Sequence, residues 1–296
     1  MKRTTSILAL ILFVTTIGFS QAQQQTDTEA EQRKAEEAAF NARVSALRNN
    51  GKQRFIRDRY KETRVYQEDI VRLYRDLDKD ERELLAPASD ILRSYPDFTG
   101  KKRGITKLIV DRGCDMGPEF VVAKDHCEKY GMPGAGSSYS FRSNMYRNRR
   151  LADVSYSEGK FTTKGVWKHG ILIALNNVSF DNLSVDSPEL KTLVGFSAEM
   201  DLEKAAAFEG HLAKGIAGGN IVYKDSHPVR NDATYVVRSI AYRGEHWEMV
   251  KEVEYDELDF DKRRDVIVAF RVVEMVPDES VTIIWKVLSD SKAPKL

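Results

Sequence analysis

The sequence has few of the residues that assign a reaction without a structure. Its five histidines stand singly, with no His-Glu-x-x-His pair of the kind that holds zinc in a metalloprotease. The segment Gly136-Ser137-Ser138 lacks the Gly-x-Ser-x-Gly elbow that places a nucleophilic serine on a sharp turn. The glycine-rich residues 131–136 lack the Lys-Ser/Thr ending of a phosphate-binding loop. No motif therefore assigns a reaction or a ligand, and no catalytic residue is predicted.

An excess of either charge is also absent. The 46 basic and 45 acidic residues leave a formal net charge of +1. Such a chain has no global field that would gather nucleic acid or an anionic membrane surface. We expect no nucleic-acid partner, and a partner attracted by charge must meet a local patch.

Long apolar runs are absent except near residue 1. Lys2 and Arg3 precede an uncharged apolar run at residues 7–19, and Ser20 and Ala22 supply small residues beside an expected cleavage point. This order of charged, apolar and small residues is typical of a secretory signal peptide. We therefore predict a signal peptide over residues 1–22, a periplasmic or secreted location, and no transmembrane anchor.

The scarcity of cysteine predicts one structural disulfide. An oxidising compartment favours pairing, and the two cysteines allow only a bond between Cys114 and Cys127. In the chain-entropy model, closing a loop of this length with a disulfide stabilises the fold by about 3 kcal/mol. The alternative is a metal site that uses both cysteines with Asp115 and His126, although zinc clusters usually have two close ligand pairs. We favour the disulfide and expect no metal and no cofactor.

The order of patterns predicts an α+β fold, with an N-terminal helical hairpin followed by a mostly antiparallel β domain with one helical insertion. Residues 28–94 are rich in helix formers, and their apolar residues recur at spacings of three and four around a turn at Asn49-Asn50-Gly51. We expect a helical region over residues 23–97, a disulfide-tied linking loop over residues 98–137 and an antiparallel β-rich domain over residues 138–296.

Short β-prone runs fill the last part of the chain. They are enriched in β-branched and aromatic residues and are separated by turn residues, which favours antiparallel strands. Helical spacing returns at residues 187–214 and predicts the helical insertion. The expected strands cover residues 139–142, 161–167, 171–175, 234–242, 250–255, 266–273 and 281–288.

The last two strands also allow a prediction of register. If Val276 lies opposite Val281 across the turn, Arg271 lies opposite Lys286. Like charges in directly opposed positions are unfavourable. A neighbouring acidic strand, expected at residues 250–255, would relieve the repulsion. The other resolution is an anionic ligand held between Arg271 and Lys286.

Two further groups of side chains are candidates for ligand binding. Trp167 and His169 place an aromatic ring and an imidazole on one face of a strand, just before a bend. A basic segment interleaves arginines with aromatic residues, which suits an anionic polymer, and the alternative is a solvated turn with ordinary ion pairs. The arginines chosen from this segment are Arg142, Arg149 and Arg150.

The leading hypothesis is an exported, non-enzymatic protein of the cell envelope with a role in binding or interaction. Its partner would be another envelope protein or a second copy held through the N-terminal helices, and a cavity inside the β domain could take a small ligand. The rival hypothesis is an exported hydrolase that acts on an envelope or extracellular polymer. It would use His169 and an acid from the cluster at residues 256–261, converging in one cleft.

Overall fold

The computed structural model describes residues 60–115, 127, 131–175 and 178–295. The predicted signal peptide, the turn at residues 49–51 and His126 lie outside the described residues. Residues from Tyr60 onward belong to one compact unit.

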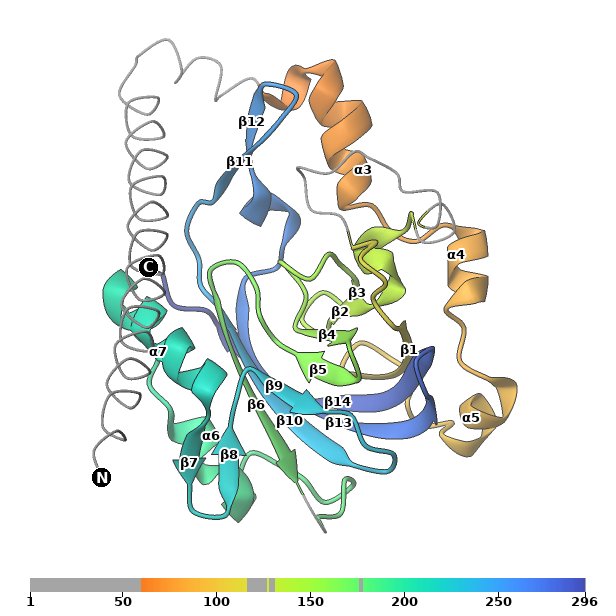
Figure 1. Cartoon of the computed structure of the whole chain (residues 1–296), viewed down its shortest axis with the longest axis vertical. Helices are drawn as coiled ribbons and strands as arrows, with labels where there is room; N and C mark the ends of the chain where they lie inside the picture. The colour runs from red at the N-terminus through yellow and green to blue at the C-terminus, as the bar shows by residue number, and fades with distance from the viewer. Residues whose placement is uncertain (1–59, 116–126, 128–130, 176–177, 296) are drawn as a thin grey trace, which may run out of the picture. The chain divides into compact units, whose positions relative to one another are not determined.

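Five antiparallel strands form the main sheet of this unit (Figure 1). Runs of β-branched and aromatic residues favour their extended backbone. The strand formed by residues 103–109 lies in the segment that was expected to be a linking loop, and it pairs with the strand formed by residues 280–292. In spatial order the strands are β1 (Arg103–Ile109), β14 (Ser280–Lys292), β13 (Arg264–Val276), β10 (Thr234–Ala241) and β6 (Lys168–Leu175).

A second five-stranded sheet packs against one face of the main sheet. Because successive side chains of a strand point to opposite faces, Tyr235 and Val237 enter the core between the sheets, whereas Val236 faces the other way. The rings of Phe141 and Trp285 lie 5.3 Å apart in this core. In spatial order the strands of the second sheet are β3 (Met145–Tyr146), β2 (Ser138–Ser140), β4 (Val154–Ser157), β5 (Lys160–Thr162) and β9 (Ser226–Pro228).

Short helices and a small hairpin cover the opposite face of the main sheet. Leu193 and Leu212 from two of these helices pack with Val236 and Ile267 in a second core cluster. The helical spacing at residues 187–214 thus corresponds to helices that bury one side against the sheet. The covering elements are η5 (Pro188–Leu190), α6 (Lys191–Gly195), α7 (Leu202–Lys214), β7 (Ile216–Gly218) and β8 (Ile221–Tyr223).

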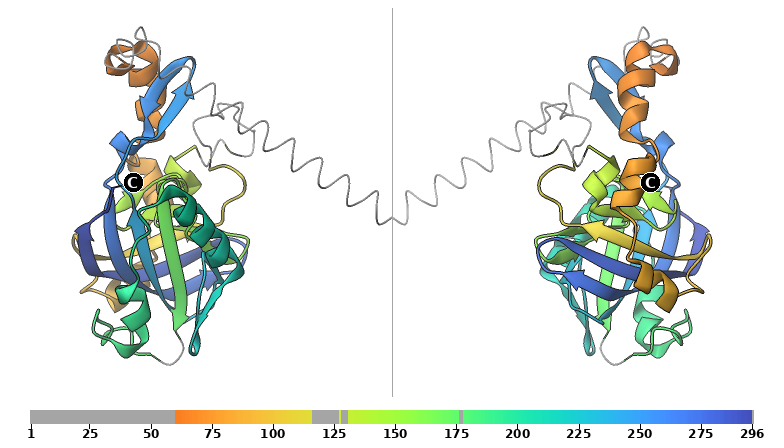
Figure 2. Two further views of the ribbon diagram at one scale, coloured as in Figure 1. Left: turned by 90° about the vertical axis from the view of Figure 1, so that its left-hand side faces the viewer. Right: turned by 90° about the vertical axis from the view of Figure 1, so that its right-hand side faces the viewer.

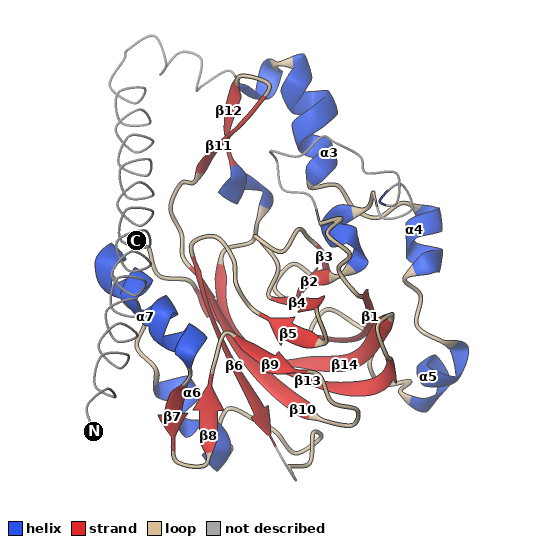
Figure 3. Cartoon of the chain, viewed as in Figure 1, coloured by secondary structure: helices blue, strands red, loops and turns tan. Residues whose placement is uncertain are grey.

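The predicted N-terminal helical hairpin is wrong. The described part of that region contains only short helical segments, so the fold of the described residues is mostly antiparallel β with few short helices (Figure 3). The apolar stripe of Tyr66, Ile70 and Tyr74 packs on the hairpin β11–β12, and it therefore needs no second helix as a partner. Figure 2 shows α3 beside this hairpin. The elements are η1 (Tyr60–Glu62), η2 (Tyr66–Ile70), α3 (Val71–Leu73), α4 (Lys79–Leu84), α5 (Ser89–Ser94), β11 (Trp247–Val250) and β12 (Val253–Asp256).

Helix α4 has well-defined ends. Glu81 N donates to Asp78 Oδ1 at 3.0 Å and Asp78 N donates to Glu81 Oε2 at 2.8 Å, which forms a capping box at the start of the helix. Pro87 separates α4 from α5, because proline supplies no backbone N–H and clashes with the preceding helical turn. Leu84 of α4 packs in one cluster with Ile109 of β1 and Tyr146 of β3, so the helix lies beside these strands.

The run at residues 250–255, expected to be one strand, is part of a hairpin. Lys251 and Glu252 have positive φ angles of 46° and 67°, and Val250 pairs with Val253 across them. A two-residue turn with positive φ at both positions matches the right-handed twist of paired strands. The chain therefore reverses in the middle of the β-prone run.

The predicted register of β13 and β14 is wrong because the turn is one residue tighter than expected and a β-bulge between Val272 and Glu274 adds a second shift. Val276 pairs with Ser280, and Glu279 N donates to Val276 O at 3.1 Å. Arg271 consequently lies opposite Ile284, not opposite Lys286. The postulated repulsion between these two cations across the hairpin does not arise.

Candidate functional site

A groove of about 470 Å³ lies between α4, β1 and the β2–β3 hairpin. Its volume falls in the usual range of small-ligand pockets. Two tyrosine hydroxyls beside it are already engaged, since Tyr146 Oη donates to Lys107 O at 2.7 Å and Tyr139 Oη donates to Asn144 Oδ1 at 2.9 Å. The ring faces thus contribute apolar surface. The apolar lining consists of Leu77, Leu85, Ala86, Pro87, Ile105, Tyr139, Met145 and Tyr146.

The rim of the groove has charges of both signs. Asp76 and Arg82 line it and are exposed. Among the described residues, no ion pair engages either side chain. An apolar floor with an acid and a base at the rim can take the apolar part of an amphipathic ligand and orient its polar ends.

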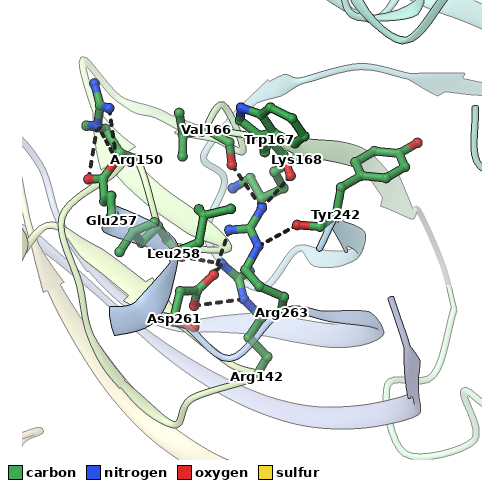
Figure 4. Close-up of polar contacts among 12 residues, drawn as sticks. Arg142, Arg150, Val166, Trp167, Lys168, Tyr242, Glu257, Leu258, Asp261 and Arg263 are labelled. Atoms are coloured by element: carbon green, nitrogen blue, oxygen red, sulfur yellow. Dashed lines mark hydrogen bonds and ion pairs between the residues drawn. The ribbon is translucent and has the colours of Figure 1, made fainter. Parts of the chain in front are cut away.

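Arg142 lies in the interior and is not part of a surface patch. Its Nη2 lies 2.7 Å from Asp261 Oδ2 (Figure 4). Its Nη1 pairs with Asp153, and all three side chains are fully buried. Arg263 Nη1 lies 2.7 Å from the same Asp261 oxygen. Burial acts to raise the pKa of Asp261, but Arg142 and Arg263 together hold it below its usual range. The guanidinium of Arg142 is therefore committed to internal acids.

Lys168 lies beside this buried ion network on β6. Its ammonium donates to Ala152 O, and no acidic group forms an ion pair with it among the described residues. Burial lowers the pKa of Lys168 to about 7. The amine can therefore change its protonation state near neutral pH.

Arg150 joins a second polar cluster, separate from that of Arg142. Its Nε lies 3.1 Å and its Nη2 2.9 Å from Glu257 Oε2, and Nη2 also pairs with Glu248 (Figure 4 shows Arg150 with Glu257). Tyr74 Oη donates to Glu257 Oε1 at 3.0 Å. His246 completes the cluster, with Nε2 at 2.8 Å from Glu248 Oε1.

Arg149 differs from the other two arginines because its side chain is 64% exposed. Its backbone N–H donates to Asp115 Oδ2 at 2.7 Å. Burial raises the pKa of Asp115 to about 6. The three arginines chosen from the sequence thus occupy three different environments, and no common anion-binding patch results.

His169 pairs with an acid from α7. Its Nδ1 lies 3.1 Å from Glu209 Oε1, its side chain is buried, and its Nε2 has no hydrogen-bond partner among the described residues. The ring of Tyr242 stands perpendicular to the imidazole at 5.1 Å, and its buried hydroxyl likewise has no partner there. The expected acid from residues 256–261 does not meet His169. Trp167 has a positive φ of 48°, and its ring packs over Gly244.

Arg271 and Lys286 contact different loops. Arg271 Nη2 lies 3.8 Å from Asp232 Oδ1. Lys286 Nζ donates to Asp181 O at 2.8 Å and lies 5.2 Å above the ring centre of Phe180. The two cations do not converge on one anion site.

Sequence reasoning missed several members of these clusters. His246 and Glu248 are two residues apart, so they point to one side of extended backbone. This spacing would have predicted the pair if the strand at residues 247–250 had been predicted. No sequence pattern predicted that Glu209 and Tyr242 contact His169. Both residues are distant from His169 in sequence and reach it only through tertiary packing. The acids at residues 256–261 and the arginines at residues 142–150 were separate candidates, and the structure makes them partners.

Cys114 and Cys127 form the predicted disulfide. A disulfide-bonded pair fits an extracellular or periplasmic location. Within the described ranges, no helix is long and apolar enough to span a membrane. No family model, no curated protein and no solved structure matches the chain.

Proposed function

We propose that the protein is an exported, non-enzymatic binding protein whose groove beside α4 holds the apolar part of an amphipathic ligand. The observation that carries the proposal is the groove itself, with aromatic and aliphatic side chains on its floor and Asp76 and Arg82 at its rim. Such a lining favours a ligand that buries an apolar body and keeps polar ends near water.

The state of the arginines supports an amphipathic ligand over a polyanion. Arg142 and Arg150 already neutralise Asp261 and Glu257, so binding an anionic polymer would require breaking buried or half-buried ion pairs. The location that we propose is the periplasm or the cell exterior, supported by the disulfide. A segment of another envelope protein has the required chemistry, since it can offer apolar side chains with charges beside them.

Native mass spectrometry of the protein purified from its own compartment tests the proposal. We expect a mass above that of the polypeptide, because a bound ligand or partner survives gentle ionisation. Ala86→Trp adds an indole at an exposed position in the groove and should abolish the extra mass. Ala217→Trp, at an exposed position on β7, is the matched control and should retain it. An adduct that persists in Ala86→Trp would contradict binding in the groove.

The second candidate is a hydrolase, and the His169–Glu209 pair is the observation that favours it. A carboxylate beside Nδ1 orients the imidazole, and its buried Nε2 has no hydrogen-bond partner among the described residues, an arrangement that resembles the base of an acid–base pair. Glu209→Gln would lower any hydrolytic rate on an envelope polymer and leave groove binding unchanged. Equal rates in the wild type and the variant would exclude this role for the pair.

A further inference from the structure

The base of the β11–β12 hairpin gathers an imidazole and two carboxylates. His246 directly precedes β11, and His246 and Glu248 point to the same face because strand side chains alternate. Glu257 directly follows β12, and its N–H donates to His246 O at 2.8 Å, so the two residues lie side by side across the hairpin. The strand ladder therefore fixes the positions of all three residues.

The donor atoms are close enough to share one ion. His246 Nε2 lies 2.8 Å from Glu248 Oε1 and 4.0 Å from Glu257 Oε2, and the three donor atoms all lie within 4.8 Å of one another. Nitrogen and oxygen ligands about 2.0–2.2 Å from a zinc ion stand about 3 to 4 Å from one another. Small side-chain rotations would bring the three atoms to those separations.

A cationic group already occupies the centre of the three donors. Arg150 Nη2 lies 3.0 Å from His246 Nε2 and 2.9 Å from Glu257 Oε2, and it contacts Glu248 as well. The charge balance is incomplete, because two carboxylates and one guanidinium leave one negative charge. A divalent cation with a neutral imidazole would balance both carboxylates.

Neighbouring residues orient two of the three donor residues, and the cluster is partly exposed to solvent. Tyr74 Oη donates to Glu257 Oε1 at 3.0 Å, and Asp256 Oδ1 accepts from His246 N at 2.9 Å, which orients two of the donors. The side chains of Arg150 and His246 are 33% and 26% exposed. An ion can therefore reach the cluster, and the guanidinium can leave it for solvent.

We propose that His246, Glu248 and Glu257 bind a divalent transition-metal cation of the zinc class, which displaces the guanidinium of Arg150. Imidazole with carboxylate oxygens is a donor set that suits zinc. The three ligands lie outside the groove, so the site is independent of the proposed function.

Isothermal titration of the metal-stripped full chain with zinc sulfate at neutral pH tests this site. We expect one ion per chain in the wild type and at least a tenfold loss of affinity in His246→Ala and in Glu248→Gln. His211→Ala, which removes an exposed histidine from α7, should bind like the wild type. The groove variant Ala86→Trp should also bind like the wild type, which separates this test from that of the proposed function.

Arg150→Met should increase the zinc affinity at least tenfold, because the competing cation is gone. If circular dichroism shows that this variant does not fold, Arg150→Lys replaces it, and its shorter, single-headed cation should also increase the affinity. Absence of one-to-one binding in the wild type, or equal affinities in the wild type and His246→Ala, would overturn the proposal.

Discussion

At the scale of single residues, two polar clusters of the described chain pair arginines with acids. The sequence presents the arginines at residues 142–150 and the acids at residues 256–261 as separate groups, and folding joins them in two clusters. The disulfide could be predicted because two cysteines allow a single pairing. The partners of Arg142 and Arg150 could not, since they depend on which distant segments meet.

Removal of the charge on Asp261 tests the buried ion network. Asp261→Asn leaves the buried Arg142 and Arg263 without a shared anion, and we expect a loss of about 3 to 5 kcal/mol in the free energy of unfolding. Urea unfolding followed by circular dichroism measures it. Glu68→Gln, in an exposed pair with Arg64, is the control and should cost less than about 1 kcal/mol. Similar losses in the two variants would contradict a structural role for the network.

Lys168 makes the stability depend on pH. Burial lowers its pKa in the folded chain from 10.5 to about 7. Between these values the unfolded chain binds more protons, so the free energy of unfolding rises with pH across that interval. Lys168→Met should therefore stabilise the protein most below pH 7, by a few kcal/mol, since each tenfold change in proton affinity corresponds to about 1.4 kcal/mol.

Urea unfolding at pH 6 and pH 9 measures the effect of Lys168→Met, and the gain should be larger at pH 6. Lys160→Met, at an exposed position on β5, is the control and should leave the pH dependence unchanged. A gain that is equal at both pH values would mean that the amine does not titrate as argued.

At the scale of elements, the sequence predicted four strands of the main sheet, β6, β10, β13 and β14, but missed six other described strands: β1, β3, β4, β7, β8 and β9. The β-prone run at residues 250–255 contains a hairpin turn that was not predicted. Lys251 and Glu252 adopt left-handed backbone there, although neither is the glycine or asparagine that usually indicates such a turn. The predicted turn between β13 and β14 was one residue too wide, and a bulge between Val272 and Glu274, which has no sequence signal, shifted the register by another residue. The groove could not be predicted from the sequence, because its walls come from α4, β1 and the β2–β3 hairpin, which come together only in the folded chain.

The β13–β14 turn depends on the left-handed backbone of Asp278, whose φ is 57°. A β-branched side chain is strained in this region, so Asp278→Val should lower the free energy of unfolding by about 1 to 2 kcal/mol. Asp278→Gly should be neutral or slightly stabilising, because glycine adopts this conformation freely. Thermal unfolding of the two variants measures the difference. Glu279→Val, at the next exposed position, is the control, and a loss as large as that of Asp278→Val would argue against backbone strain.

At the scale of the whole unit, the main sheet is buried on both faces, each within one of the two largest core clusters of the described residues. The helical spacing at residues 60–74 misled the fold prediction because a stripe that packs on a hairpin has the same period as one that packs on a helix. The order of strands could not be predicted, since β1 pairs with a strand more than 170 residues further along the chain.

The disulfide lies outside the two large core clusters of this unit. Cys114 and Cys127 pack with Ala135. The double variant Cys114→Ser with Cys127→Ser should lose about 3 kcal/mol in the free energy of unfolding and keep its β-sheet circular dichroism spectrum. Loss of that spectrum would show that the bond is required for folding.

The position of β14 determines when a newly made chain can fold. This strand lies between β1 and β13, yet among the described strands it is synthesised last. Until then, β1 and one side of β13 have unpaired backbone groups that can attract strands from other chains. We therefore expect nascent chains to depend on a chaperone until β14 has been synthesised.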